Sequence, residues 1–244
     1  MLRFLNIVVL APELIGSQII ELLKKCNSEL NYYSAPSLVA LEKYDATFLK
    51  KSRLIACASA EIVPKNILDK FGFGCINVHL GPPSLPGWQP AAFALYDAVL
   101  KYGITMHYMV EKVDAGEIIA IESFQLHKDH DYESLVSCLS ACAMRLLARM
   151  AHDLTQADRM APLPIAWGPR KTTRELFRQY CQIDLLIEKN ELERRVLAFG
   201  QGDGDSKLTL IADEQKYFLA KNQKARIGKY YKKIHGVLFY RAQT

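Results

Sequence analysis

The sequence of 244 residues lacks several signatures that would identify a common class of enzyme or a membrane protein. No GxGxxG follows the first apolar run, where the chain has Ala11-Pro12-Glu13-Leu14, and no GxxxxGK[ST] occurs. The usual dinucleotide-binding and P-loop interpretations therefore lose their main support, because both depend on glycines that let the backbone approach phosphate. No unbroken run of about 18 apolar residues is present, so a membrane-spanning helix is not expected.

Cysteine patterns and leader signals are also missing. Six cysteines occur without a CxxC pair: Cys26, Cys57, Cys75, Cys138, Cys142 and Cys181. No histidine cluster completes a metal site, so no metal is expected. Buried thiols kept reduced in the cytoplasm are the simplest interpretation. The opening stretch LRFLNIVVL has one Arg and no small-residue cleavage site, so it predicts a first core strand rather than a signal peptide.

Acidic residues are scarce toward the C-terminus. Residues 163–244 carry 16 Lys and Arg against nine Asp and Glu, whereas residues 1–162 carry 15 against 17. The segment Lys221–Lys233 contains six basic residues and no acid. Such a block can meet phosphates or RNA, and a solvated surface is the alternative.

Strand and helix patterns alternate through the first two thirds of the chain. We expect strands at 5–10, 54–58, 75–80, 104–111 and 117–126, and helices at 13–25, 64–71, 91–101 and 132–154. This order predicts an α/β fold with a mostly parallel, Rossmann-like sheet covered by helices. Pro162 and Pro164 mark a boundary, so we predict one domain over 1–160 and a small C-terminal α+β extension over 161–244. The extension is predicted to hold helices at 173–180 and 188–198 and strands at 208–212 and 217–220.

Three polar residues stand where a parallel sheet binds ligands. Asn77 and His79 lie on one side of the predicted strand CINVHL, because side chains alternate along a strand. They come at its carboxyl end, just before the Pro-rich loop at 81–90, and this edge of an open α/β sheet is the usual binding site. Asp114 follows in a turn between two predicted strands. An amide and an imidazole can hold a developing oxyanion, and a carboxylate can accept a proton. Each of these residues taken alone also has a purely structural explanation.

Together these residues resemble a known family. Asn-x-His, a Pro-rich loop with Ser-Leu-Pro, and a later Asp-x-Gly, found here in INVHLGPPSLPGWQPAAFALYDAVLKYGITMHYMVEKVDAGEII, resemble the folate-dependent formyltransferases. That family includes the glycinamide ribonucleotide, methionyl-tRNA and sugar N-formyltransferases. The resemblance covers most of residues 1–160 and implies that Asn77, His79 and Asp114 are catalytic. Asn77 and His79 would then hold the oxyanion formed when an amine attacks the formyl carbon, and Asp114 would take the proton of the amine.

The resemblance also implies the formyl donor, N10-formyltetrahydrofolate. In the family its pterin lies against a loop before a helix and against the loop with the catalytic Asp, which correspond to 59–64 and 112–114 here. The donor-binding residues implied are Ser59, Ile62, Val63, Pro64 and Val113.

The acceptor is less clearly implied than the donor. The Pro-rich loop would hold it, with Pro83, Ser84, Trp88 and Gln89 as the binding residues. Leu80 replaces the Pro that sugar enzymes often have after the His, and Ser84–Trp88 resembles the tRNA enzymes and the sugar enzymes about equally. Arg170, Lys171, Arg194 and Arg195 could meet a diphosphate, with surface ion pairs as the alternative.

Two features that the sequence lacks favour a nucleotide-linked amino sugar as acceptor. Residues 11–17 do not match the phosphate loop of the glycinamide ribonucleotide enzymes, and the roughly 80 residues after the boundary are fewer than the C-terminal barrel of the methionyl-tRNA enzymes needs. The segment Glu193–Ala198 resembles part of the smaller C-terminal extension of the sugar enzymes. A tRNA or other amine formyltransferase remains the second interpretation, for which the basic segment is the best argument. A formyltetrahydrofolate deformylase and a non-catalytic binder remain further alternatives. The resemblance implies a cytoplasmic enzyme without membrane contact, and it leaves a homodimer open.

Overall fold

The computed structural model describes residues 3–127, 129–201, 207–220 and 231–241, and the chain forms two compact units. The first unit comprises residues 1–86, 101–125 and 137–170, and the second comprises 87–100, 126–136 and 171–244. Two segments that precede residue 160, namely 87–100 and 126–136, thus belong to the second unit. The domain division at residue 160 stays a prediction based on sequence order alone.

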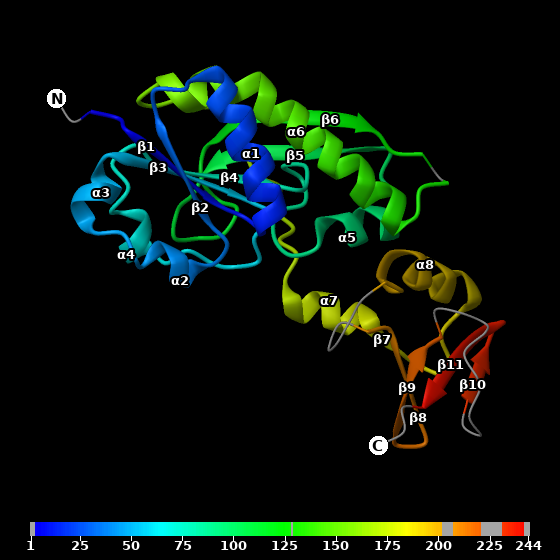
Figure 1. Ribbon diagram of the computed structural model, residues 1–244. Coiled ribbons are helices and arrows are strands. Elements are labelled where there is room, and N and C mark those ends of the chain that lie inside the picture. Colours follow the sequence, from blue (N-terminus) through cyan, green and yellow to red (C-terminus); the bar gives the residue numbers. More distant parts are fainter. Residues whose placement is uncertain (1–2, 128, 202–206, 221–230, 242–244) are drawn as a thin grey trace. The chain divides into compact units, whose positions relative to one another are not determined.

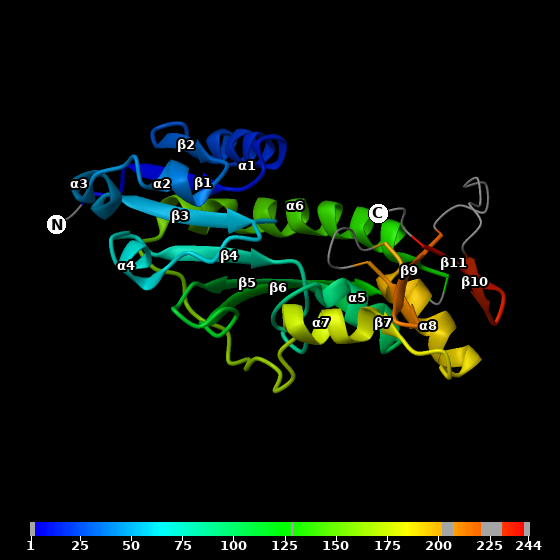
Figure 2. The ribbon, with the colours of Figure 1, turned by 90° about the horizontal axis from the view of Figure 1, so that it is seen from below.

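The first unit is built on a six-stranded sheet in the order β2-β1-β3-β4-β5-β6 (Figure 2). β1, β2, β3 and β4 are mutually parallel, whereas β5 and β6 run antiparallel to their neighbours. The mostly parallel α/β sheet expected from the sequence is therefore confirmed. The strands are β1 (Asn6–Leu10), β2 (Asn31–Ala35), β3 (Ser52–Cys57), β4 (Cys75–His79), β5 (Lys101–Tyr108) and β6 (Ile118–Gln125).

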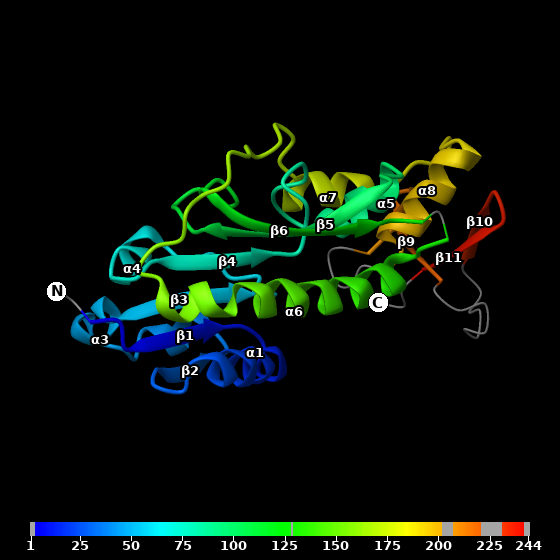
Figure 3. The same cartoon turned by 90° about the horizontal axis from the view of Figure 1, so that it is seen from above.

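Helices cover both faces of this sheet, which explains why β1 and β3 are apolar runs without alternation. α1 (Glu13–Cys26) and α6 (Tyr132–Gln156) lie in front of the sheet in Figure 3, while α2 (Leu38–Leu41) lies in front of it in the opposite view of Figure 2. α3 (Ala46–Lys50) and α4 (Lys65–Leu68) share the face of α2, because their apolar residues join one core cluster with those of β1, β3 and β4.

Helix α6 has the length and apolar composition of a membrane span, judged by those two properties alone, and no other described helix has both. The apolar sequence of α6 is interrupted by the charged residues Arg145 and Arg149, which are exposed. Arg145 and Arg149 lie on the solvent side and contact Glu122. Leu139, Leu146, Leu147 and Leu154 are buried on the other side. Packing against the sheet therefore accounts for the apolar face of this helix.

The second unit combines three helices with a smaller sheet. α5 (Pro90–Tyr96), α7 (Arg174–Cys181) and α8 (Lys189–Phe199) pack through edge-to-face and tilted aromatic contacts. The sheet has the order β10-β11-β9-β8-β7 (Figure 1). Its strands are β7 (Gln182–Ile183), β8 (Thr209–Ala212), β9 (Gln215–Leu219), β10 (Tyr231–Ile234) and β11 (Val237–Arg241). A second, α+β unit toward the C-terminus agrees with the prediction.

Several element boundaries differ from the prediction. The helix expected over 91–101 ends at Tyr96, because Ala98 has a left-handed φ of 49° and Lys101 already begins β5. β2, α2, α3, β7, β10 and β11 were not predicted, since short or half-polar segments give no clear periodicity. Of the basic segment, 221–230 lies outside the described residues, and Lys232 and Lys233 lie in β10.

A buried arginine joins the start of β3 to the end of α6. Arg53 is fully buried, and its guanidinium donates to the carbonyl oxygens of Phe73, Asp153, Leu154, Ala157 and Asp158 at 2.5–3.4 Å. Its Cζ also lies 4.8 Å from the ring centre of Phe4. Burial lowers the pKa of Arg53 to about 10, so the group stays charged at neutral pH. A cation at this position complements the negative end of the helix dipole and satisfies the last carbonyls of α6.

Replacing Arg53 is therefore expected to destabilise the first unit strongly. In Arg53→Met the five carbonyls lose their donor. We expect the free energy of unfolding to fall by about 3–5 kcal/mol, as when one partner of a buried charged network is removed. Urea unfolding with an unchanged m-value would measure this. Arg145→Met, on the exposed side of α6, is the matched control and should change stability by less than about 0.5 kcal/mol. Equal effects of the two substitutions would contradict the role assigned to Arg53.

Candidate active site

Asn77 and His79 project from the same face of β4, as expected from the alternation along a strand. β4 is the last parallel strand of the sheet, and antiparallel β5 pairs with it so that Asn77 lies opposite His107 and His79 opposite Thr105. His79 and His107 are buried, and Asn77 is half-buried. The antiparallel pairing therefore adds a histidine from β5 to the two residues that the sequence indicated.

The Asp114 carboxylate lies between two imidazoles. Its Oδ2 is 3.3 Å from Nδ1 of His79, and its Oδ1 is 3.3 Å from Nε2 of His107. Asn77 Nδ2 is 3.2 Å from the same Nε2 of His107. The structure thus brings Asn77, His79 and Asp114 together, as the sequence pattern predicts. His107 was not predicted, because its place in the cluster follows from the register of β4 and β5.

Two backbone carbonyls complete the polar contacts of the histidines. Nε2 of His79 is 3.0 Å from the carbonyl oxygen of Leu85, and Nδ1 of His107 is 2.8 Å from that of Tyr108. Burial lowers the pKa of His79, and the opposing attraction of the Asp114 carboxylate only partly offsets this. A histidine with this balance is neutral near pH 7 and can donate or accept a proton.

The turn that carries Asp114 is shaped by close backbone contacts. Asp114 has a left-handed φ of 46°, which Asp tolerates better than most residues. A Cβ on Gly116 would lie 1.9 Å from the carbonyl oxygen of Tyr108, so only glycine fits there. The Asp-Ala-Gly sequence therefore lets the chain double back onto β5 while the carboxylate points inward.

Trp167 covers the cluster from the segment that follows α6. Its ring meets those of His79 and His107 edge to face, with centroid distances of 5.6 and 4.9 Å. Its Nε1 donates to the carbonyl oxygen of Gly116 at 2.8 Å. Gly168 N donates to the carbonyl oxygen of Pro83 at 2.8 Å. This segment connects the Asp114 turn to the start of the Pro-rich loop, and the sequence pattern did not indicate it.

Comparison with known proteins gives a match to one family. Residues 33–150 match the formyl transferase family model. The match covers just under half of the chain and includes the polar cluster. The resemblance identified from the sequence motif is thereby confirmed.

The chain is similar to several proteins named as formyltransferases. It is 36% identical over 109 residues to the methionyl-tRNA formyltransferase of Bacillus cytotoxicus, a match that covers 44% of this chain and only 35% of that enzyme. A sugar N-formyltransferase from a Shewanella species shares the fold with a TM-score of 0.70 at 16% identity, covering 91% of this chain and 99% of that one. A formyltransferase from Anoxybacillus kamchatkensis gives a TM-score of 0.61 at 19% identity, covering 72% of this chain and 89% of that one.

The predicted donor-binding loop follows β3 directly. Ala58, at its start, has a left-handed φ of 52°. Val63 is buried in the core, whereas Ile62 is 65% exposed. Ser59 accepts a hydrogen bond from Glu61 N at 3.3 Å, and Pro64 precedes the first turn of α4. The loop therefore offers backbone and the Ile62 side chain to a ligand, while Val63 anchors it. Val113, in the Asp114 turn, is half-buried.

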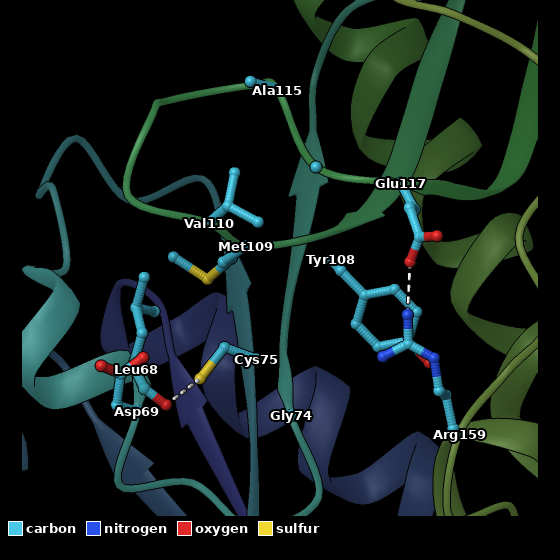
Figure 4. A pocket seen from close by; sticks show the side chains of 11 residues that line it. Leu68, Asp69, Gly74, Cys75, Tyr108, Met109, Val110, Ala115, Glu117 and Arg159 are labelled. Carbon is cyan, nitrogen blue, oxygen red and sulfur yellow. Dashed lines mark hydrogen bonds and ion pairs between the residues drawn. The ribbon is translucent and has the colours of Figure 1, made fainter.

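A cavity of about 390 Å³ lies beneath the Asp114 turn (Figure 4). In Figure 4 Met109 and Val110 stand close to Leu68 and Cys75, and Arg159 meets Glu117 on the other side. Arg159 also lies over the ring of Tyr108, 4.6 Å from its centre. The cavity is lined by Leu68, Asp69, Gly74, Cys75, Tyr108, Met109, Val110, Ala115, Gly116, Glu117 and Arg159. Its walls offer both apolar and charged surface next to the residues that flank Asp114.

The four predicted acceptor-binding residues divide between the two units. Pro83 and Ser84 belong to the first unit, where the Leu85 carbonyl contacts His79. In the second unit, the Arg174 guanidinium lies 4.4 Å from the ring centre of Trp88. Gln89 has a φ of 52° and accepts a hydrogen bond from the Tyr132 hydroxyl at 2.8 Å. One face of the Trp88 ring is therefore covered by a cation.

Two arginines suggested for a diphosphate have partners within the second unit. Arg195 contacts Glu191 at 2.6 Å and the carbonyl oxygen of Gln182 at 2.9 Å. Arg194 donates to the carbonyl oxygen of Tyr96 and lies over its ring at 4.1 Å. These contacts fix α8 to its neighbours, which is the structural alternative that the sequence left open. Among the described residues no group of three His, Cys, Asp or Glu could hold a metal ion.

The turn geometry predicts a strong effect of adding one methyl group. In Gly116→Ala the new Cβ must displace the Tyr108 carbonyl or the turn itself, moving Asp114 away from both imidazoles. We expect a loss of about 1–3 kcal/mol in stability, measured by urea unfolding. Gly16→Ala in α1, where the nearest atom is 3.4 Å away, is the control and should gain up to about 1 kcal/mol. A Gly116→Ala protein as stable as wild type would show that the turn is not so constrained.

Proposed function

We propose that this protein transfers a formyl group from N10-formyltetrahydrofolate to the amine of a nucleotide-linked amino sugar. The observation that carries the proposal is the cluster in which Asp114 contacts His79 and His107, while half-buried Asn77 contacts His107. An amide, an imidazole and a carboxylate gathered in this way provide donors for an oxyanion and a route for a proton.

The reaction balances with these groups alone. The neutral amine attacks the formyl carbon, and the carbonyl oxygen becomes negative. Asn77 Nδ2–H and His79 Nε2–H hold that oxyanion, the latter in place of its present bond to the Leu85 carbonyl. The tetrahedral intermediate collapses by breaking the bond from the formyl carbon to N10. The proton lost by the amine passes through the His79–Asp114 pair, directly or by way of a water, and N10 gains one proton.

The donor has a binding region beside the cluster. The exposed side chains of Ile62 and Val110 offer apolar surface to a flat ring. The cavity under the Asp114 turn provides further apolar wall at Met109 and Leu68, with Asp69 at its edge. We propose that the pterin lies between the 59–64 loop and the Asp114 turn, where its N10 substituent can reach the formyl-transfer centre.

Relatives support a sugar acceptor. The Anoxybacillus formyltransferase was solved in complex with a UDP-linked 4-formamido sugar and tetrahydrofolate, and the Shewanella protein is a sugar N-formyltransferase. The Anoxybacillus protein covers 72% of this chain and the Shewanella protein covers 91%. We infer that Pro83, Ser84, Trp88 and Gln89 bind the acceptor. We place the enzyme in the cytoplasm, where the buried thiols of Cys57 and Cys75 stay reduced.

The second candidate is a methionyl-tRNA formyltransferase. The Bacillus relative bears that name, and the C-terminal basic segment would suit tRNA phosphates. This chain matches only 35% of that relative's length, so its acceptor specificity does not transfer.

An acceptor panel decides between the candidates. The protein is incubated with N10-formyltetrahydrofolate and UDP-, dTDP- and GDP-linked 3-amino and 4-amino sugars, and in parallel with charged initiator tRNA. We expect one nucleotide sugar to gain the mass of one formyl group, in proportion to the tetrahydrofolate released. Formylation of the tRNA alone would overturn the sugar assignment. Release of free formate without any acceptor would instead indicate a deformylase.

Removing either oxyanion donor is expected to abolish most turnover. Asn77→Ala and His79→Ala should each lower kcat by about a hundredfold or more, because each removes a donor to the developing oxyanion. The formyl-transfer rate is measured with circular dichroism as a check on folding. Asn66→Ala on α4 and His152→Ala on α6 remove the same side chains from exposed positions and should leave kcat unchanged. Near-normal kcat in both site variants would remove the proposed mechanism.

A further inference from the structure

His107 shares the buried cluster with Asn77, His79 and Asp114, and the proposed reaction gives it no step. It is 2% exposed and lies directly opposite Asn77 across the β4–β5 pair. Its Nε2 has two polar neighbours, Asn77 Nδ2 at 3.2 Å and Asp114 Oδ1 at 3.3 Å. Whether this Nε2 donates or accepts a hydrogen bond depends on which of the two ring nitrogens carries the hydrogen.

The backbone fixes that tautomer. The Tyr108 carbonyl oxygen, 2.8 Å from Nδ1 of His107, can only accept a hydrogen bond, so Nδ1 carries the hydrogen. In the neutral ring Nε2 is then an acceptor. The group of Asn77 that faces it must be the amide NH2 and not the carbonyl oxygen, which would repel the lone pair. One main-chain carbonyl thereby determines which way the Asn77 amide points.

We propose that His107 is a positioning residue, which holds the Asn77 amide with its nitrogen inward so that the second N–H can donate to the formyl oxygen. The inference rests on the proposed function, because it gives Asn77 its role as a donor. Without His107 the amide can rotate and present its carbonyl oxygen to the reacting group, and a carbonyl repels a developing oxyanion.

The same nitrogen ties this orientation to the Asp114 carboxylate. The groups facing His107 are Asn77 from β4, Asp114 from the turn and the uncharged ring of Trp167, with His79 on the far side of the carboxylate. Nε2 accepts from Asn77 when the ring is neutral, and donates to Asp114 when the ring is charged. It cannot do both at once, so the donor orientation and the charge of the cluster are linked.

Two substitutions separate hydrogen bonding from packing. His107→Gln keeps one acceptor and one donor near the position of Nε2, whereas His107→Leu fills the space with neither. We expect kcat to fall by about 30-fold or more in His107→Leu with each KM within about threefold, since the lost interaction acts on the transition state. His107→Gln should stay within about fivefold of wild type. His152→Leu on the exposed side of α6 is the control and should match wild type.

A double-mutant cycle tests whether His107 acts through Asn77. In the Asn77→Ala background, His107→Leu should cost less than about threefold in kcat, because the amide to be oriented is already gone. An equal penalty in both backgrounds, or a normal kcat in His107→Leu alone, overturns the proposal. Loss of kcat in His107→Gln as large as in Asn77→Ala also overturns it, since hydrogen bonding would then not be the relevant property.

Nuclear magnetic resonance of the unliganded protein tests the inference without any acceptor. In wild type the side-chain NH2 of Asn77 should show one hydrogen-bonded proton, and this signal should survive in His107→Gln. In His107→Leu, which offers the amide no acceptor, that signal should disappear. Should His107→Leu not fold, His107→Gln still decides: loss of the hydrogen-bonded proton in His107→Gln with an unchanged kcat overturns the inference. If wild type formylates no acceptor, the proposed function fails while these spectra still report on His107.

Discussion

A buried carboxylate sets the architecture around the candidate active site. Among the described residues Asp114 is the one acid with a buried side chain, and a buried charge persists only with partners that stabilise it. Its partners come from two neighbouring strands, so β4 and β5 must pair in the observed register for the charge to be tolerated. The turn must bring that carboxylate back over the sheet. It therefore has a left-handed conformation at Asp114 and a glycine at position 116.

The segment after α6 depends on a second buried charge. Arg53 holds the final carbonyls of α6, and from there the chain runs past Leu163, which bonds to the first residue of β6, to Trp167 above the two histidines. A guanidinium suits this position because its planar fork can donate to several carbonyls at once. Two charges, one at each end of the segment, therefore determine where the aromatic cover of the cluster lies.

The proposed catalytic residues and the proposed acceptor-binding residues are distributed unequally between the two units. The cluster and the proposed donor surface lie in the first unit, which also contains most of the region matched by the family model. Two of the four proposed acceptor residues, Trp88 and Gln89, belong to the second unit, where Arg174 and Tyr132 hold them. If the proposed function holds, the acceptor contacts could change in the course of evolution while the cluster stays the same.

Much of the first unit could be predicted from its amino-acid sequence, including its candidate catalytic residues. The strand CINVHL placed Asn77 and His79 on one face because side chains alternate, and its apolar neighbours β1 and β3 were recognisable as strands buried on both faces. The motif identified the family and pointed to Asp114. Polar or short segments such as β2 and β7 gave no such signal.

Contacts between segments far apart in the sequence bring the other residues into the cluster. His107 enters it through strand register and Trp167 through a chain reversal after α6, and neither depends on any local pattern in the sequence. Arg194 and Arg195 looked available for phosphate, yet Glu191 and backbone carbonyls of the second unit engage them. Periodicity and motifs report what a residue does along its own strand or helix, whereas contacts between distant segments arise when the chain buries its polar groups together with their partners.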